Sequence, residues 1–376
     1  MARRRYAADS TDLDRLVDEL VLRAAREYGR ADESDSVRQI VVTALRLLRD
    51  GAEEPDARML SSALKELRHA LRVFAPYEAV RKVAVFGSAR TGPGSAEWRQ
   101  AFDFAERIVR AGWMVITGAG GGIMAAAQGG AGREASFGVN IRLPFEQQAN
   151  EVIAGDAKLI NFRYFFTRKV VFVKESHAIA LFPGGFCTHD EGFEALTLIQ
   201  TGKSELVPVV FVDVPGGSYW REWEEWVRTH LAARRLVSEH DLGLFRVTDD
   251  AAAAVHEILD FYSNYHSCRY VGERLVLRLR HAPDPEQLEA LNLDFADLLV
   301  SGAIEASGPL PQERGEFPDY ARLVLRFDRR EMGRLRALVD ALNDMVPESA
   351  PPPRDAGPLE VVEASLPPEA ESAEQE

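Results

Sequence analysis

The feature that most constrains the fold of this chain is a set of short apolar runs that lead directly into glycines. Runs at 83–86, 114–117 and 178–182 are each followed by a glycine loop and then a helix-like stretch, and further runs lie at 138–142 and 207–212. Strands that are apolar at nearly every position occur in parallel sheets covered by helices on both faces. The sequence therefore predicts an α/β fold with a Rossmann-like, doubly wound parallel sheet.

The regions on either side of these runs have different patterns. Before them, apolar residues recur at helical spacing in three stretches, which predicts amphipathic helices. After them, strand-like and helix-like segments alternate and indicate a small α+β appendage. The predicted regions are an N-terminal helical region (1–78), the Rossmann-like domain (79–265), the appendage (266–345) and a disordered, acidic, proline-rich tail (346–376).

Composition excludes several classes of partner. The formal net charge of -14 argues against general binding of nucleic acid or of an anionic membrane surface. The chain has only two cysteines, Cys187 and Cys268, which rules out a disulfide framework and favours a reducing compartment. The sequence also lacks an apolar run of about 18 residues that could span a bilayer. We therefore expect a cytoplasmic protein without nucleic-acid or membrane partners.

The strongest local signal lies between residues 181 and 200. An apolar strand breaks at Pro183-Gly184-Gly185, and a helix begins near Thr188. Glycines let a backbone approach a ligand closely, and a helix start offers unpaired N–H groups and the positive end of the helix dipole. This pattern favours a bound phosphate, although an ordinary strand-to-helix turn explains the segment equally well when it is taken alone.

Two further glycine loops support the phosphate interpretation. Gly87 and Ser88 end the first strand, and Gly120, Gly121 and Gly122 follow the second. Neither loop fits the dinucleotide fingerprint G-x-G-x-x-G at the first strand or the Gly-Lys-Ser/Thr of a P-loop, so nicotinamide binding and ATP hydrolysis lose support. Open α/β sheets bind ligands at the carboxyl ends of their strands, where all three loops are expected.

A cationic pair, Arg168 and Lys169, stands at the start of an apolar helix before the strand at 178–182. Such a pair beside aromatic residues usually lies on a solvent-exposed face of a helix. With three glycine loops in the same domain, it becomes a candidate for binding an anion, and the planar guanidinium is the more specific of the two groups.

Together, these segments resemble the Lonely Guy (LOG) family. Residues 183–191 are similar to the family signature PGGxGTxxE, and Thr167-Arg168-Lys169 is similar to its companion Arg-Lys motif. The other two glycine loops stand in the family's order, and the resemblance covers about residues 82–215. It implies a nucleotide-binding, commonly dimeric α/β protein. Several members hydrolyse the N-glycosidic bond of nucleoside 5′-monophosphates, releasing the free base and ribose 5-phosphate.

The resemblance, carried over by position, implies that Arg168 and Glu191 form the catalytic pair. A carboxylate beside the ribose can stabilise an oxocarbenium-like state or position water, and a guanidinium can hold phosphate or base. The alternative for Glu191 is favourable charge in the first turn of a helix. The nucleotide-binding residues implied are Gly87, Ser88, Gly120, Gly121, Gly122, Lys169, Gly184, Gly185 and Thr188.

The expected ligand is an AMP-like nucleoside 5′-monophosphate, and the expected assembly is a homodimer or a higher homo-oligomer. We expect no metal, because the histidines lack the spacing of metal ligands. We expect no other cofactor either. The older family label of lysine decarboxylase would require pyridoxal phosphate and a Schiff-base lysine, and no lysine in the sequence is singled out for that role.

Two departures from the family pattern leave alternatives open. Cys187 stands where the motif has glycine, and Ala125 stands where many relatives carry glutamate. These residues favour a catalytically silent nucleotide-binding or sensor protein, and a carrier of a larger phosphorylated cofactor is a third alternative. Cys187 near a helix N-terminus, with His189 close by, could also be a reactive thiol, although no third group can be assigned to orient such a pair.

Overall fold

A computed structural model describes residues 6–8, 10–142 and 148–346, and the chain divides into two compact units, Met1–Arg68 and His69–Glu376. All of the predicted disordered tail except Val346 lies outside the described residues. The predicted boundary at residue 78 stays a prediction.

The N-terminal unit is helical, which confirms that part of the fold prediction. It contains α1 (Thr11–Glu27), α2 (Ser34–Arg49) and the larger part of α3 (Glu54–Phe74). Val17, Val21 and Val42 form the centre of a small apolar core. The buried Arg38 joins α2 to α1 through ion pairs with Asp14 (2.9 Å) and Asp18 (2.6 Å).

The second unit contains a seven-stranded sheet, formed by described residues, in which every neighbouring pair is parallel. This sheet confirms the predicted Rossmann-like α/β class. The strand order is β4-β3-β2-β1-β5-β6-β7. The strands are β1 (Lys82–Phe86), β2 (Met114–Thr117), β3 (Ser136–Ile141), β4 (Leu159–Phe162), β5 (Ala178–Leu181), β6 (Val209–Val212) and β7 (Phe245–Thr248).

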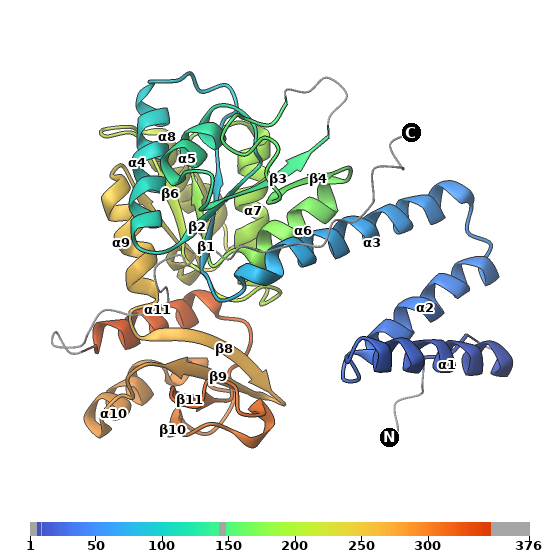
Figure 1. The fold of residues 1–376 in the computed structure, drawn as a ribbon. Helices are drawn as coiled ribbons and strands as arrows, with labels where there is room; N and C mark the ends of the chain where they lie inside the picture. Colours follow the sequence, from blue (N-terminus) through green and yellow to red (C-terminus); the bar gives the residue numbers. More distant parts are fainter. Residues whose placement is uncertain (1–5, 9, 143–147, 347–376) are drawn as a thin grey trace. The chain divides into compact units, whose positions relative to one another are not determined.

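Helices cover both faces of this sheet, which explains why β1, β2, β5 and β6 are buried at every position. Figure 1 shows α4, α5 and α9 on one side of the sheet and α6 and α7 on the other. The helices are α4 (Ala96–Arg110), α5 (Ile123–Ala131), α6 (Phe165–Glu175), α7 (Phe186–Gln200), α8 (Tyr219–Trp226) and α9 (Ala251–Phe261).

The tryptophans of α8 belong mainly to the core. Trp220 is fully buried, and the Trp223 ring stacks on Phe211 of β6 with 4.5 Å between the ring centroids. Trp226 is exposed. A helical aromatic stripe of this kind packs the sheet, as its spacing indicates, rather than forming a surface for stacking bases.

The order of the strands determines where a ligand can approach. The chain builds outward from β1 to β4 on one side and then returns to place β5 on the other side of β1. At such a switch point the loops that follow the two adjacent strands separate, and open α/β sheets bind their ligands there. The loops after β1 and β5 are two of the three glycine loops.

The C-terminal appendage is a separate antiparallel sheet of order β10-β11-β9-β8, as the predicted α+β appendage requires. Glu313, fully buried, forms ion pairs with Arg278 (2.8 Å) and Arg322 (3.1 Å). The elements of the appendage are β8 (Tyr265–Val271), β9 (Arg274–Leu279), α10 (Pro285–Asp294), β10 (Glu305–Ser307), β11 (Ala321–Leu325) and α11 (Met332–Asp344).

Among the described residues, no helix combines the length and the apolar character that spanning a membrane requires.

Candidate functional site

The structure brings the three glycine loops together at the carboxyl ends of β1, β2 and β5. Ser88 donates its backbone N–H to Pro183 O (3.1 Å), and Ile123 donates its N–H to Ser88 O (3.0 Å). The loop after β1 is thus hydrogen-bonded to both of the others. We call the three loops, residues 87–88, 118–122 and 183–185, the glycine-loop site.

Packing explains some of these glycines but not all of them. A Cβ at Gly184 would lie 2.2 Å from Thr188 Oγ1, and one at Gly122, which has a φ of +63°, would lie 2.2 Å from Ser88 O. At Gly185, by contrast, a Cβ would meet nothing within 4 Å. Packing and backbone geometry therefore explain why Gly122 and Gly184 are glycines. At Gly185 they do not, and the open space beside it leaves its backbone accessible to a ligand.

The N-terminus of α7 points its amides toward this open space. The first hydrogen bond of the helix runs from His189 N to Gly185 O (3.2 Å), so the N–H groups of Phe186, Cys187 and Thr188 precede the helical ladder. Gly185, the N-cap residue, has no side chain to cap them. Free amides at the positive end of a helix dipole are the usual protein environment for a phosphate.

A hydrogen-bonded pair that the sequence did not reveal holds this loop in place. The Tyr219 hydroxyl donates to Gly184 O (2.5 Å) and lies 2.7 Å from His189 Nε2. Because the peptide bond is trans, its N–H points away from its C=O. Tyr219 therefore fixes the Gly184 carbonyl on one side, which directs the Gly185 N–H to the other side.

Arg168 lies buried behind the loop that follows β2. Its Nε donates to Val139 O of β3 (3.0 Å), and one of its terminal nitrogens lies 3.5 Å from Glu191 Oε1. A Cβ at Gly118 would come within 2.8 Å of the same guanidinium. The missing side chain at Gly118 thus makes room for Arg168, and the structure brings together the two residues predicted as the catalytic pair.

Glu191 is a buried carboxyl group in the first half of α7, with 11% of its side chain exposed. Burial raises its pKa to about 7, and the smaller effects of Arg168 and Lys169 act in the opposite direction. A carboxyl group with a pKa near the working pH exchanges protons readily, which is the property required of a general acid or base. Favourable charge at a helix N-terminus does not require such burial.

Lys169 has a different environment from Arg168. Its ammonium group forms ion pairs with Asp190 (2.7 Å) and Glu194 (3.2 Å) on α7. Adjacent helix positions point about 100° apart, so Lys169 faces these carboxylates while Arg168 faces β3. The phosphate-binding role predicted for Lys169 stays a prediction, and its ammonium is already engaged by two carboxylates.

Asn150 is a second residue that the sequence did not reveal. Its side-chain nitrogen lies within hydrogen-bonding distance of Ala119 O (3.1 Å), Gly120 O (2.9 Å) and Gln128 Oε1 (2.6 Å). These contacts tie the loop after β2 to α5. No local pattern marks Asn150, which is distant in sequence from the loop that it holds.

Cys187, the main departure from the family motif, is exposed in the first turn of α7. It is not among the residues with positive φ, so the backbone at this position does not require glycine. The thiol therefore leaves the loop geometry intact. Among the described residues, His189 directs its Nε2 to Tyr219, which removes support from a Cys187–His189 nucleophile.

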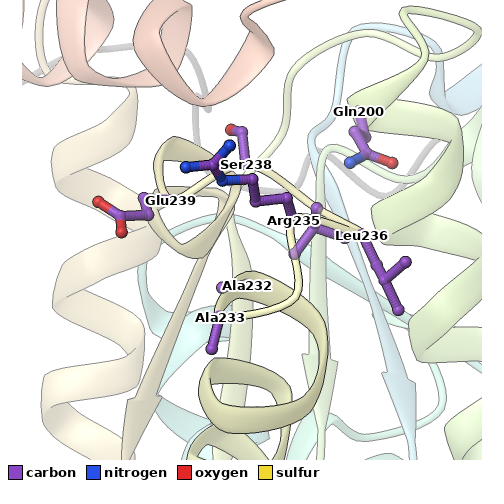
Figure 2. A pocket seen from close by; sticks show the side chains of 8 residues that line it. Gln200, Ala232, Ala233, Arg235, Leu236, Ser238 and Glu239 are labelled. Carbon is purple, nitrogen blue, oxygen red and sulfur yellow. The ribbon is translucent and has the colours of Figure 1, made fainter.

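A separate hollow has a volume of about 650 Å³, and Figure 2 shows the side chains that line it. Gln200 at the end of α7 lines it, together with residues 232–233 and 235–239. None of the predicted site residues borders this hollow. Its size alone does not make it the functional site, because it lacks both the glycine loops and a buried acid.

Fold and site together define a Rossmann-like α/β protein in which a helix without a side-chain cap begins at the switch point of the sheet. Residues 121–258 match the family model described as "possible lysine decarboxylase", the model of the LOG family. The matched segment covers about a third of the chain and includes the motifs at 167–169 and 183–191, so the α/β domain is similar to the LOG family in this segment.

The search of solved structures found molybdenum cofactor proteins among its matches. The carrier protein from Chlamydomonas reinhardtii is 24% identical, with 47% of this chain and 94% of that chain covered and a TM-score of 0.34. The binding protein from the phototrophic bacterium Rippkaea orientalis is 18% identical, with 47% and 93% covered and a TM-score of 0.33. The search of curated proteins found no match.

Proposed function

We propose that the glycine-loop site binds a nucleoside 5′-monophosphate and hydrolyses its N-glycosidic bond. The observation that carries this proposal is Glu191, a buried carboxyl with a pKa raised to about 7, beside Arg168 and on the helix whose N-terminus offers free amides. A phosphate on those amides would place the rest of the nucleotide along the same edge of the sheet.

In the proposed reaction a water oxygen attacks C1′ of the ribose, the C1′–N bond breaks, and the base leaves with its bonding electrons. Either Glu191 takes a proton from the water while solvent protonates the departing base, or Glu191 protonates the base while solvent takes the proton from the water. Arg168, held in a fixed orientation by Val139 O, neutralises the carboxylate or contacts the phosphate. The products are the free base and ribose 5-phosphate. This chemistry requires no metal or other cofactor.

A catalytically silent nucleotide-binding or sensor protein is the second candidate. The change to Cys187 favours it, because a larger residue stands in the first turn of α7, beside the expected phosphate. A carrier of a larger phosphorylated cofactor is a third candidate, which copurification of a chromophore or an extra mass would support. In each case we expect a cytoplasmic homodimer or higher homo-oligomer, and sedimentation velocity measures the assembly.

The deciding experiment is chromatographic detection of free base after incubation with AMP, GMP, CMP and UMP. We expect release from at least one nucleotide and a loss of about a hundredfold or more in Glu191→Gln. Glu194→Gln, which removes a carboxylate that pairs with Lys169 one turn further along α7, is the matched control and should retain activity. Unchanged nucleotide, together with a nucleotide-dependent rise in melting temperature, would refute hydrolysis and favour the silent binder.

A pH profile assigns the direction of proton transfer. If Glu191 acts as a base, the rate at saturating nucleotide rises as the pH increases through about 7. If it acts as an acid toward the leaving base, the rate falls over the same interval.

A further inference from the structure

A second cavity, of about 1100 Å³, lies at the opposite end of the sheet from the glycine loops. The residues that border it come from the amino ends of β1, β5 and β6, from the C-terminal parts of α6 and α7, and from β8 of the appendage. None of the three glycine loops lines it. Among the residues predicted to bind the nucleotide, Lys169 borders the cavity, whereas Arg168, Glu191 and the three glycine loops do not.

The inner wall of this cavity is positively charged. Arg81, only 8% exposed, places its guanidinium 3.5 Å from the ring centroid of Tyr262 and contacts His266 O. Arg278 lies in the same wall and is also buried. The pKa of His266 is lowered to about 4, first by burial and then by Arg81 and other nearby arginines. A positive field of this kind favours an anionic ligand.

A buried hydroxyl group points to the same kind of ligand. Ser176 is 7% exposed, lines the cavity, and has no hydrogen-bond partner for its Oγ among the described residues. The β1–β5 register places Val83 beside Ala178, so its extension by two residues places Arg81 beside Ser176. A buried hydroxyl without a partner is unfavourable, and an acceptor oxygen of a bound ligand would satisfy it.

The five glutamates of the lining do not favour a cation. Glu316 is paired with Arg269 and Arg278, Glu175 with Lys174, and Glu194 with Lys169. Burial raises the pKa of Glu205, which favours its neutral form, and Glu78 is exposed. In the described part of the chain, no three His, Cys, Asp or Glu side chains are grouped so that they could hold a metal ion. The negative ends of the α6 and α7 dipoles lie beside Lys174 and Lys203, which offset them.

We propose that this cavity is a second ligand site for a small anionic molecule, whose phosphate or carboxylate group lies against Arg81 and accepts a hydrogen bond from Ser176. The bound molecule would contact the C-terminal parts of α6 and α7, the helices that carry Arg168 and Glu191. A small hollow lined by Glu191 shares Lys169 and Glu194 with the cavity lining, so α6 and α7 connect the cavity to Glu191.

The test is calorimetric titration of the full chain with inorganic pyrophosphate and, separately, with citrate. We expect saturable binding of at least one probe, weakened about tenfold in Ser176→Ala by the loss of one hydrogen bond to a charged group. Ser176→Ala removes no bond of the unliganded protein, so its melting temperature should not fall. Ser238→Ala, in the hollow of Figure 2, is the matched control and should bind normally. Tighter binding of pyrophosphate assigns a phosphate ligand, and tighter binding of citrate a carboxylate ligand.

Lys203→Glu provides an independent variant, because it reverses an exposed charge in the lining without disturbing the core. It should weaken the same probe by at least about tenfold. Failure of both probes to bind would overturn the proposal. So would binding that Ser176→Ala and Lys203→Glu leave unchanged while Gly185→Ala abolishes it, because the probe would then occupy the glycine-loop site. Release of free base from nucleotides tests the proposed hydrolase separately.

Discussion

Replacing Glu191 with glutamine should stabilise the protein at neutral and alkaline pH. Burial raises the pKa of this carboxyl from 4.5 to about 7. The unfolded chain therefore loses the proton near pH 4.5, whereas the folded chain keeps it up to about pH 7. Between these values the folded state binds more protons, so the free energy of unfolding falls as the pH rises, and above pH 7 it stays at its reduced level.

The size of the expected change in the free energy of unfolding follows from the pKa shift of Glu191. One pKa unit corresponds to about 1.4 kcal/mol, so the ionised Glu191 costs about 3 kcal/mol at pH 8 and almost nothing at pH 4. Glutamine resembles the neutral carboxyl at every pH. The free energy of unfolding of Glu191→Gln should therefore exceed that of the wild type by an amount that grows from near zero at pH 4 to about 3 kcal/mol at pH 8.

Urea unfolding followed by tryptophan fluorescence at several pH values measures this difference. All five tryptophans lie in the unit that contains Glu191, so the signal reports that unit alone. Glu194→Gln, at a carboxyl that is 33% exposed and paired with Lys169, is the control and should not become more stable than the wild type as the pH rises. A difference that is constant from pH 4 to pH 8, or a variant less stable than the wild type at pH 8, would refute the assignment of Glu191 as a buried acid.

Three further predictions concern the residues that shape the glycine-loop site. Gly184→Ala should lower the melting temperature, because its new Cβ would lie 2.2 Å from Thr188 Oγ1. Gly185→Ala should leave the melting temperature unchanged but weaken AMP binding in an equilibrium titration. Normal AMP affinity in Gly185→Ala would favour the purely structural explanation of the loop. Tyr219→Phe should weaken AMP binding about tenfold, since the hydroxyl that contacts Gly184 O and His189 Nε2 is lost and the Gly184 carbonyl is no longer fixed. Asn150→Ala should reduce the free energy of unfolding in urea by about 2 kcal/mol, and an unchanged value would show that its hydrogen bonds do not stabilise the loop.

The sequence predicted the centre of the sheet better than its edges. The runs that became β1, β2, β5 and β6 are apolar throughout because helices cover both of their faces. The edge strands β4 and β7 were not predicted. They read Leu-Ile-Asn-Phe and Phe-Arg-Val-Thr and are only partly buried, so neither shows a continuous apolar run.

The candidate site, like the sheet, could be predicted only in part. The glycine loops could be predicted to meet because parallel strands bring their carboxyl ends to one edge. Asn150 and Tyr219 could not be predicted, because each reaches the site from a segment distant in sequence and neither belongs to a motif. The raised pKa of Glu191 also depends on tertiary burial, which the spacing of a motif does not encode.

Residues that do not serve folding gather at the carboxyl edge of the sheet. Ala119, buried in the loop after β2, has a φ of +63°, a strained conformation for a residue other than glycine that costs about 1 kcal/mol or more. Glu191 adds about 3 kcal/mol when ionised, and the Phe186 side chain, 96% exposed, contributes no burial. Natural chains break local folding rules mainly at functional sites. Each of the three lowers stability or adds none to it through the stated feature, so their presence on adjoining segments supports a ligand site that is maintained at a cost in stability.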